Sequence, residues 1–412
     1  MTHLTPRRTL LAAAAASLMA ATLGAHAFEN KEEGVLTQEI VLGSSQPLSG
    51  TLAYMGKAVD EGMRTYFDMV NEQGGVNGRK IKLITYDDEL KPAKSVANAK
   101  LLVERDKVFA MVGNIGHATN ISAYEYSSTK KVPTIGALSI SDLTSNPPRD
   151  LLYVLPSPQS TETAAYIDHA VEVLKAKKIA MLYQNDGWGK PAYDIAVQRM
   201  EKHGMKLVEA QTFERFATDL TSQVFKLKQA EPDVVIVYAL GQEAVQFFRG
   251  AEKLGWKPTV FGAGGLNDPK FIELLGKTQS KLYVASYYDA VDGNNPAIQS
   301  FFQSYTKLYP KSAPTSMALM GYSSAAVTVE ALKRTGAEPS RAKVVAELDG
   351  MKDFDQKIGP KITFQPVSAG GYARRGQTGV ALMELKDQKF VSMGSYIDPV
   401  SYTHLTLPTI YS

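Results

Sequence analysis

Short β-branched runs alternate with longer amphipathic stretches along most of the chain, and this alternation limits the possible folds more than any other feature. Residues 40–42 and 80–86 have the composition of strands, and residues 57–71 between them have helical spacing and end before Gly74-Gly75. Strands that alternate with helices of this length form βαβ units around a parallel sheet. The sequence therefore predicts an α/β fold.

The same alternation starts again after Pro147-Pro148, with strand-like runs at residues 178–183 and 233–238. The chain has 412 residues, whereas single hydrophobic cores usually stop growing at about 300 residues. We therefore expect two doubly wound, Rossmann-like lobes. Ligands bind outside the carboxyl ends of the strands in such sheets, so the loops of two facing sheets would line one shared cleft.

The first 27 residues have the three parts of a signal peptide. Arg7 and Arg8 are followed by an apolar stretch at residues 10–23 and by Ala25-His26-Ala27, which suits signal peptidase. The apolar stretch is shorter than the roughly 20 residues that span a membrane. We expect export to the periplasm as a soluble protein, by the general or the twin-arginine route. Residues 401–412 lack any periodicity and are predicted to be a non-native tail.

Charge and chemistry exclude several classes of function. The net charge of +3 includes Arg7 and Arg8, so the remainder carries 3 − 2 = +1 and predicts no nucleic-acid partner. There is no cysteine, which rules out thiol catalysis. No HExxH, P-loop lysine or GxSxG motif occurs, and His117, His169 and His203 lack metal-ligand spacing. We expect no enzyme activity, no catalytic residue, no metal and no cofactor.

Several local motifs together carry a family resemblance. They are residues 71–81 with Asp87-Asp88 after the next strand, and residues 47–50, 184–189 and 254–258. With these motifs the chain resembles, over residues 39–399, the type I periplasmic binding proteins of ABC transporters, the branched-chain-amino-acid (Leu/Ile/Val-binding) type. That family captures a solute between two lobes and delivers it to an ABC permease in the inner membrane. A ligand-sensing receptor or regulator of the same fold is the alternative.

The resemblance also implies a domain layout. The two lobes would be joined by a three-segment hinge, with crossings near residues 151–156, 285–289 and 362–365. Lobe 1 would consist of residues 28–150 and 287–363, and lobe 2 of residues 151–286 and 364–400.

The resemblance places the ligand's carboxylate on lobe 1, at the loops 113–119 and 136–139. Loops that run into helix N-termini present free N–H groups to an anion. Thr119 and Ser139 could instead cap helices, and His117 could face solvent. The implied contacts on these loops are His117, Ala118, Thr119, Ala137, Leu138 and Ser139.

The remaining site residues come from the first loop and from lobe 2. Ser49, Tyr54 and Met55 would form a cleft wall, although Tyr54 and Met55 could simply pack. Trp188 would lie on the ligand, or else anchor its loop. Leu240 and Gly264 would complete the second lobe, but Gly264 stands where the family has a Glu that pairs the ligand's ammonium group. We therefore expect a small carboxylate-bearing ligand, either an organic or aromatic acid or an amino-acid-like compound.

Overall fold

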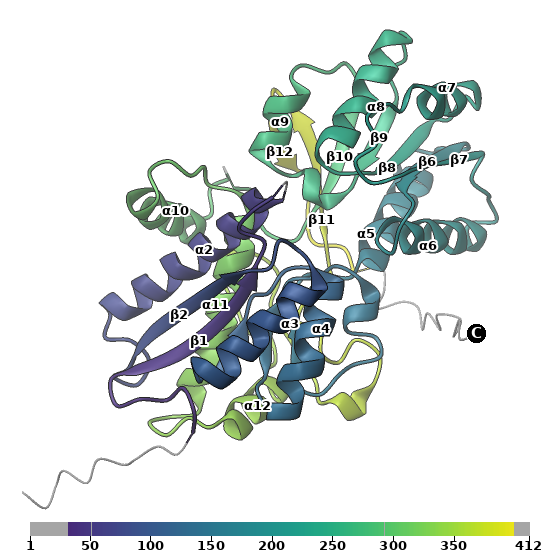
Figure 1. Ribbon diagram of the computed structural model, residues 1–412. Coiled ribbons are helices and arrows are strands. Elements are labelled where there is room, and N and C mark those ends of the chain that lie inside the picture. Colours follow the sequence, from purple (N-terminus) through teal and green to yellow (C-terminus); the bar gives the residue numbers. More distant parts are fainter. Residues whose placement is uncertain (1–31, 51, 292, 399–412) are drawn as a thin grey trace, which may run out of the picture.

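The computed structural model describes residues 32–50, 52–291 and 293–398. The expected signal peptide at 1–27 and the expected tail at 401–412 lie outside these residues. The described chain forms two lobes, each a sheet with helices on both faces (Figure 1). This confirms the predicted α/β class. Within the described ranges, no helix is both long and apolar enough to cross a membrane.

The sheet of lobe 1 has five parallel strands in the order β2-β1-β3-β4-β5. Ile40 and Leu42 of β1 pack in the core shared with α2 and α11, whereas Val41 packs on the opposite face with Leu102, because successive strand residues point to opposite faces. The strands are β1 (Glu39–Gln46), β2 (Lys80–Asp87), β3 (Ala110–Val112), β4 (Thr134–Ala137) and β5 (Leu152–Val154).

Lobe 1 is covered by helices from both halves of the sequence (Figure 1). They are α2 (Ala53–Glu72), α3 (Pro92–Lys100), which runs into a π-helical turn (Leu101–Arg105), α4 (His117–Ser127), α10 (Pro296–Leu308), α11 (Ser316–Arg334) and α12 (Arg341–Asp349).

The sheet of lobe 2 has seven strands in the order β12-β11-β10-β9-β8-β6-β7. The strands from β6 to β10 are parallel and repeat the winding of lobe 1, while β11 and β12 add an antiparallel hairpin. The strands are β6 (Ile179–Gln184), β7 (Glu209–Phe213), β8 (Val234–Tyr238), β9 (Thr259–Gly262), β10 (Lys281–Ser286), β11 (Ala381–Lys386) and β12 (Lys389–Ser392).

Helices again cover both faces of this second sheet. Every residue of β8 is buried, as expected for a parallel strand with helices on both sides. The helices are α5 (Gln159–Asp168), α6 (Gly189–Lys202), α7 (Thr221–Gln229), α8 (Gly241–Lys253) and α9 (Pro269–Leu275).

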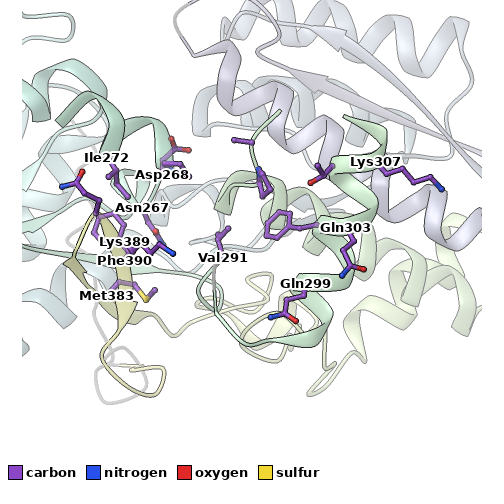
Figure 2. Close-up of a pocket in the computed structure, with 16 residues that line it drawn as sticks. Asn267, Asp268, Ile272, Val291, Gln299, Gln303, Lys307, Met383, Lys389 and Phe390 are labelled. Carbon is purple, nitrogen blue, oxygen red and sulfur yellow. The ribbon is translucent and has the colours of Figure 1, made fainter. Parts of the chain in front are cut away.

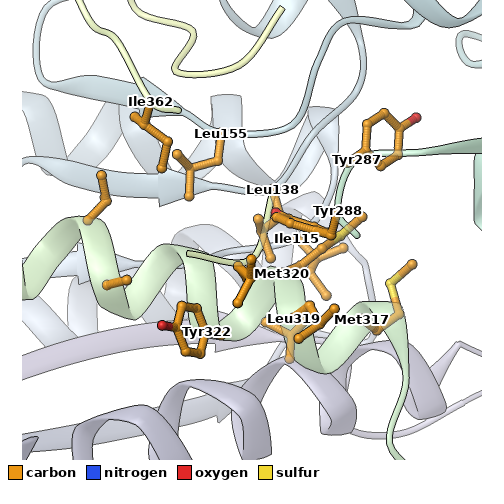
Figure 3. Close-up of a cluster of buried hydrophobic side chains, with 14 of the residues drawn as sticks. Ile115, Leu138, Leu155, Tyr287, Tyr288, Met317, Leu319, Met320, Tyr322 and Ile362 are labelled. Carbon is orange, nitrogen blue, oxygen red and sulfur yellow. The ribbon is translucent and has the colours of Figure 1, made fainter. Parts of the chain in front are cut away.

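Helices α2 and α11 cross at two glycines. A Cβ on Gly62 would lie 2.2 Å from the carbonyl oxygen of Ala318, and one on Gly321 would lie 2.2 Å from that of Val59. No side chain fits at either position. Met320 of α11 lies in an apolar cluster that includes Ile115, Leu138, Leu155 and Tyr288 (Figure 3).

The chain passes between the lobes after β5, after β10 and between α12 and β11. Strand β5 pairs with β4, so the first sheet extends to Val154 and the first crossing follows it, within the expected segment 151–156. Ile362, in the segment expected to form the third crossing, makes an isolated bridge to Phe354.

Candidate functional site

Both sheets reverse their winding between two neighbouring strands, and the predicted site residues follow these points. The reversal lies between β1 and β3 in lobe 1 and between β6 and β8 in lobe 2. Ligands of open α/β sheets bind in the crevice at such a switch point. His117 follows β3, while Trp188 and Leu240 follow β6 and β8.

On lobe 1 the structure joins His117 to Ser139 through a residue that the sequence did not single out. His117 Nδ1 lies 2.8 Å from the hydroxyl oxygen of Thr144, which lies 2.7 Å from that of Ser139. Burial, followed by the positive charges of Arg149 and Arg375, lowers the pKa of His117. The imidazole is therefore neutral at pH 7 and can offer one N–H as a hydrogen-bond donor.

The hydroxyl of Thr119 is used for a hydrogen bond within its own loop. It donates to the carbonyl of Ile115, and the residue is 2 % exposed. The N-cap of α4 is Gly116, with φ of +96° and no side-chain cap, so Thr119 does not cap this helix. Ala137 and Leu138 are buried and form the floor of the loops, while Ala118 is exposed.

The loop after β1, with the start of α2, contributes residues at the edge of the candidate site. The hydroxyl of Ser49 donates to Asp87 Oδ2 at 2.5 Å, and its backbone N–H lies 3.3 Å from Asp87 Oδ1. Tyr54 lies in the first turn of α2 and faces lobe 2, where burial and the carboxylates of Asp268 and Glu243 raise its pKa to about 12. Met55 packs against the core. Ser49 is thus held by Asp87, and Tyr54 lies between the lobes.

On lobe 2, Trp188 lies on an aromatic neighbour. Its ring centroid is 4.4 Å from that of Tyr238, with an angle of 36° between the planes. Its carbonyl accepts a hydrogen bond from Gln159 Nε2 at 2.9 Å. Tyr238 is fully buried, and its hydroxyl has no hydrogen-bond partner among the described residues. Trp188 thus presents a half-buried aromatic face above a buried polar atom.

The loop of Gly264 lacks an acid, but an acid lies directly beside it. Glu162 comes from α5 and accepts hydrogen bonds from the Gly264 N–H at 3.1 Å and from the Tyr287 hydroxyl at 2.5 Å. A Cβ on Gly264 would lie 2.9 Å from Glu162 Oε2. Burial raises the pKa of Glu162 to about 7 in spite of these hydrogen bonds. Leu240 packs over the adjacent Gly265.

A separate open groove of about 1060 Å³ lies between the lobes on the side of α10 (Figure 2). Phe302, Val291, Ile272, Met383 and Phe390 are among the apolar residues that line it. None of the predicted site residues lines it. This groove is a second interlobe surface, distinct from the switch-point loops.

Side chains of metal-ligand type gather at one place in the described part of the chain. Asp168, Glu172 and His203 place one ligand atom each within 4.8 Å of one another. Asp168 Oδ1, however, already accepts from Arg199 Nε at 2.7 Å and lies 2.8 Å from His203 Nε2. The group is a salt-bridged cluster of lobe 2.

Comparison with known proteins agrees with this architecture. A family model described as periplasmic binding protein matches residues 39–389. Leu/Ile/Val-binding protein homolog 7 of Brucella abortus (strain 2308) is 25 % identical over 316 residues, which cover 72 % of this chain and 77 % of that protein.

Two solved structures show the same fold. One is the branched-chain amino acid transporter substrate-binding protein LivJ of Streptococcus pneumoniae in complex with isoleucine, with TM-score 0.75, 20 % identity and coverage of 88 % of this chain and 100 % of that one. The other is a solute-binding protein of an ABC transporter from R. palustris in complex with benzoate, with TM-score 0.74, 18 % identity and coverage of 87 % and 97 %. These relatives are binding proteins, not enzymes, and the chain belongs to the periplasmic binding protein family.

Proposed function

We propose that this protein captures a small carboxylate-bearing solute between its lobes and delivers it to the permease of an ABC importer in the inner membrane. One observation carries the proposal: the switch points of both sheets bear complementary groups. Lobe 1 offers hydrogen-bond donors around His117 and Ser139, and lobe 2 offers the aromatic face of Trp188 on Tyr238.

The donors on lobe 1 suit an anion. Helix α4 begins at His117 with no side chain capping its first N–H groups, and such a helix end attracts negative charge. The neutral imidazole adds a donor without a buried charge, and the Ser139–Thr144 hydroxyl pair fixes its orientation. A carboxylate is the small anionic group that these donors fit.

The rest of the ligand would lie on lobe 2. An indole face binds flat or branched apolar groups well, because aromatic rings bury a large area with few rotatable bonds. The solved relatives bind isoleucine in one case and benzoate in the other, so the fold accommodates both shapes. We infer a small aromatic or aliphatic acid without a free α-ammonium group, because no residue of the 262–265 loop is acidic.

One observation favours a second candidate, an amino-acid-like ligand. The carboxyl of Glu162 lies where a side chain at position 264 would stand, and its pKa of about 7 leaves it partly ionised at neutral pH. A ligand ammonium group beside it would favour the ionised form. Binding would then release a proton, whereas binding of an acid without an ammonium group would not.

Calorimetry separates the two candidates. The mature protein is titrated at pH 7 with leucine, valine, benzoate and a 2-keto acid, each in two buffers of different ionisation enthalpy. The proposal expects binding of benzoate or the keto acid without proton release. Tight binding of leucine or valine with proton release, and no response to the other acids, would move the assignment to the second candidate. No binding of any of the four would contradict the carboxylate site.

Delivery from the periplasm requires export. We propose that residues 1–27 direct it and that the mature chain begins at Phe28. N-terminal sequencing of protein from the periplasmic fraction checks this, and an intact leader on that protein would contradict it.

A further inference from the structure

A carboxylate of lobe 1 caps a helix of lobe 2. Asp142 lies in the 3₁₀ turn (Asp142–Thr144) of the loop that follows β4, and it is 5 % exposed. Its Oδ2 accepts from the backbone N–H of Ser160 at 3.1 Å, and the Ser160 hydroxyl donates to Oδ1. Ser160 lies in the first turn of α5, whose own N-cap is Pro158 with no capping side chain. Lobe 1 therefore satisfies the first two N–H groups of α5, that of Gln159 through the Ile140 carbonyl at 2.7 Å and that of Ser160 through the Asp142 side chain.

Residues of the third crossing also bond to this loop. The hydroxyl of Tyr372 donates to Asp142 Oδ1 and lies 3.3 Å from Ser160 Oγ. Arg375 is 2 % exposed, and its guanidinium bonds the loop and the first crossing through the carbonyls of Ser139 (2.7 Å), Ser141 (2.7 Å) and Pro156 (2.5 Å) and the hydroxyl of Ser145 (2.7 Å).

The charges in this network compensate one another. Burial lowers the pKa of Arg375 to about 10, and the negative charge of Asp142 opposes that shift. Arg375 therefore stays positive at neutral pH, and the negative charge of Asp142 favours this charged form. Loss of the Asp142 charge would leave the buried Arg375 less compensated, which is costly.

The two segments that Asp142 joins each carry part of the binding site. Its own loop holds Ser139 and Thr144, and Thr144 orients His117. Helix α5 holds Gln159 and Glu162, which bond the Trp188 carbonyl and the Gly264 N–H. A displacement of α5 relative to the loop would therefore misalign the donors of lobe 1 and the aromatic face of lobe 2.

We propose that Asp142 is a positioning residue for ligand binding, which holds the lobe 1 loop and helix α5 of lobe 2 in register through the capped Ser160 N–H. The proposal rests on the function proposed above, because it assigns ligand contacts to both segments. The coupling itself exists without ligand, so the two can fail separately.

The test compares Asp142→Ala, Asp142→Asn and Ser340→Ala with the wild type. Ser340 caps α12 within lobe 1, accepting from the Lys343 N–H at 3.3 Å, so its variant loses a cap without touching the lobe contact. Hydrogen–deuterium exchange of the ligand-free proteins is followed at residues 139–145, at 159–163 and around Trp188. The tightest binder among leucine, valine, benzoate and a 2-keto acid is then titrated into each.

Asp142→Ala should raise exchange in both lobes, at 139–145 and also at 159–163 and 185–189, and should weaken binding on the order of tenfold. Asp142→Asn keeps an acceptor for the Ser160 N–H and should recover part of both effects. Ser340→Ala should raise exchange near α12 and leave affinity unchanged. If the Asp142→Ala effect stays within 139–145, or equals that of Ser340→Ala, the proposal is wrong. If exchange changes as expected while none of the four compounds binds the wild type, the ligand class fails and the coupling stands.

Discussion

The carboxyl group of Glu162 is fully enclosed, and this enclosure, more than its hydrogen bonds, decides its ionisation. In the unfolded chain the group has the ordinary pKa of 4.5, whereas burial raises it to about 7 in the fold. Between these values the unfolded chain ionises while the folded protein holds the proton, so stability falls as the pH rises. At pH values above 7 the complete shift lowers the free energy of unfolding by about 3 kcal/mol relative to low pH.

Glu162→Gln removes this titration. The variant should be close to the wild type in stability at pH 5 and more stable at pH 8, by up to about 3 kcal/mol. Urea unfolding of both proteins at pH 5, 6, 7 and 8 measures this difference in stability. Glu273→Gln is the control for the loss of a glutamate charge, since Glu273 is an exposed partner of Lys270. A stability difference between Glu162→Gln and wild type that stays constant over this range would contradict the buried ionisation.

Trp188→Ala removes the aromatic face above Tyr238. The backbone contacts of residue 188 to Asp186 and Gln159 remain, so the fold should persist. We expect a loss of affinity of about 2–3 kcal/mol for the ligand identified by calorimetry, and a smaller loss in Trp188→Phe, which keeps a ring. Equal affinity of Trp188→Ala and wild type would exclude a stacking role.

Sequence reasoning named part of the candidate site. The family resemblance implied ligand contacts at His117, Ser139 and Trp188, and in the fold each of these residues follows a strand. Glu162 and Thr144 could not, since their positions depend on contacts between segments over 100 and 27 residues apart respectively. Pairings of this kind leave no local pattern.

At the scale of elements, burial explains which helices could be predicted. Helices α2 and α8 bury one face, and their apolar spacing shows in the sequence. Helix α5 was not predicted. Its residues 159–167 are all buried, yet its first five residues are all polar, Gln159-Ser160-Thr161-Glu162-Thr163. A helix enclosed on every side shows no 3.6-residue alternation, and the ligand region depends on this one.

Gly321→Ala tests the crossing of α2 and α11. A methyl group there would meet the Val59 carbonyl at 2.2 Å, so the helices must separate, at a cost of about 2–3 kcal/mol. Gly250→Ala in α8 is the matched control, because its methyl group would meet only the side chain of Val224, at 3.2 Å. Helix propensity then offsets the contact, and stability should change by less than about 1 kcal/mol. Chemical denaturation compares the two, and equal effects would contradict the close crossing.

At the scale of the whole molecule, both lobes repeat one winding order. The predicted α/β class and the two doubly wound sheets are confirmed, because parallel strands buried on both faces leave apolar runs such as residues 234–238. The exact crossing points were harder to predict, since β5 has only three residues and its membership depends on pairing with β4.

The central claim is that a solute binds between the switch-point loops, and Trp188 can report it directly. The chain has two tryptophans, and Trp256 packs against Phe247 in the outer core of lobe 2. In Trp256→Phe protein, emission comes from Trp188 alone among tryptophans. Titration with the ligand found by calorimetry should then give a saturable emission change with one site per chain and the same dissociation constant as calorimetry. A ligand that binds this protein by calorimetry while Trp188 emission stays constant to saturation would contradict the account.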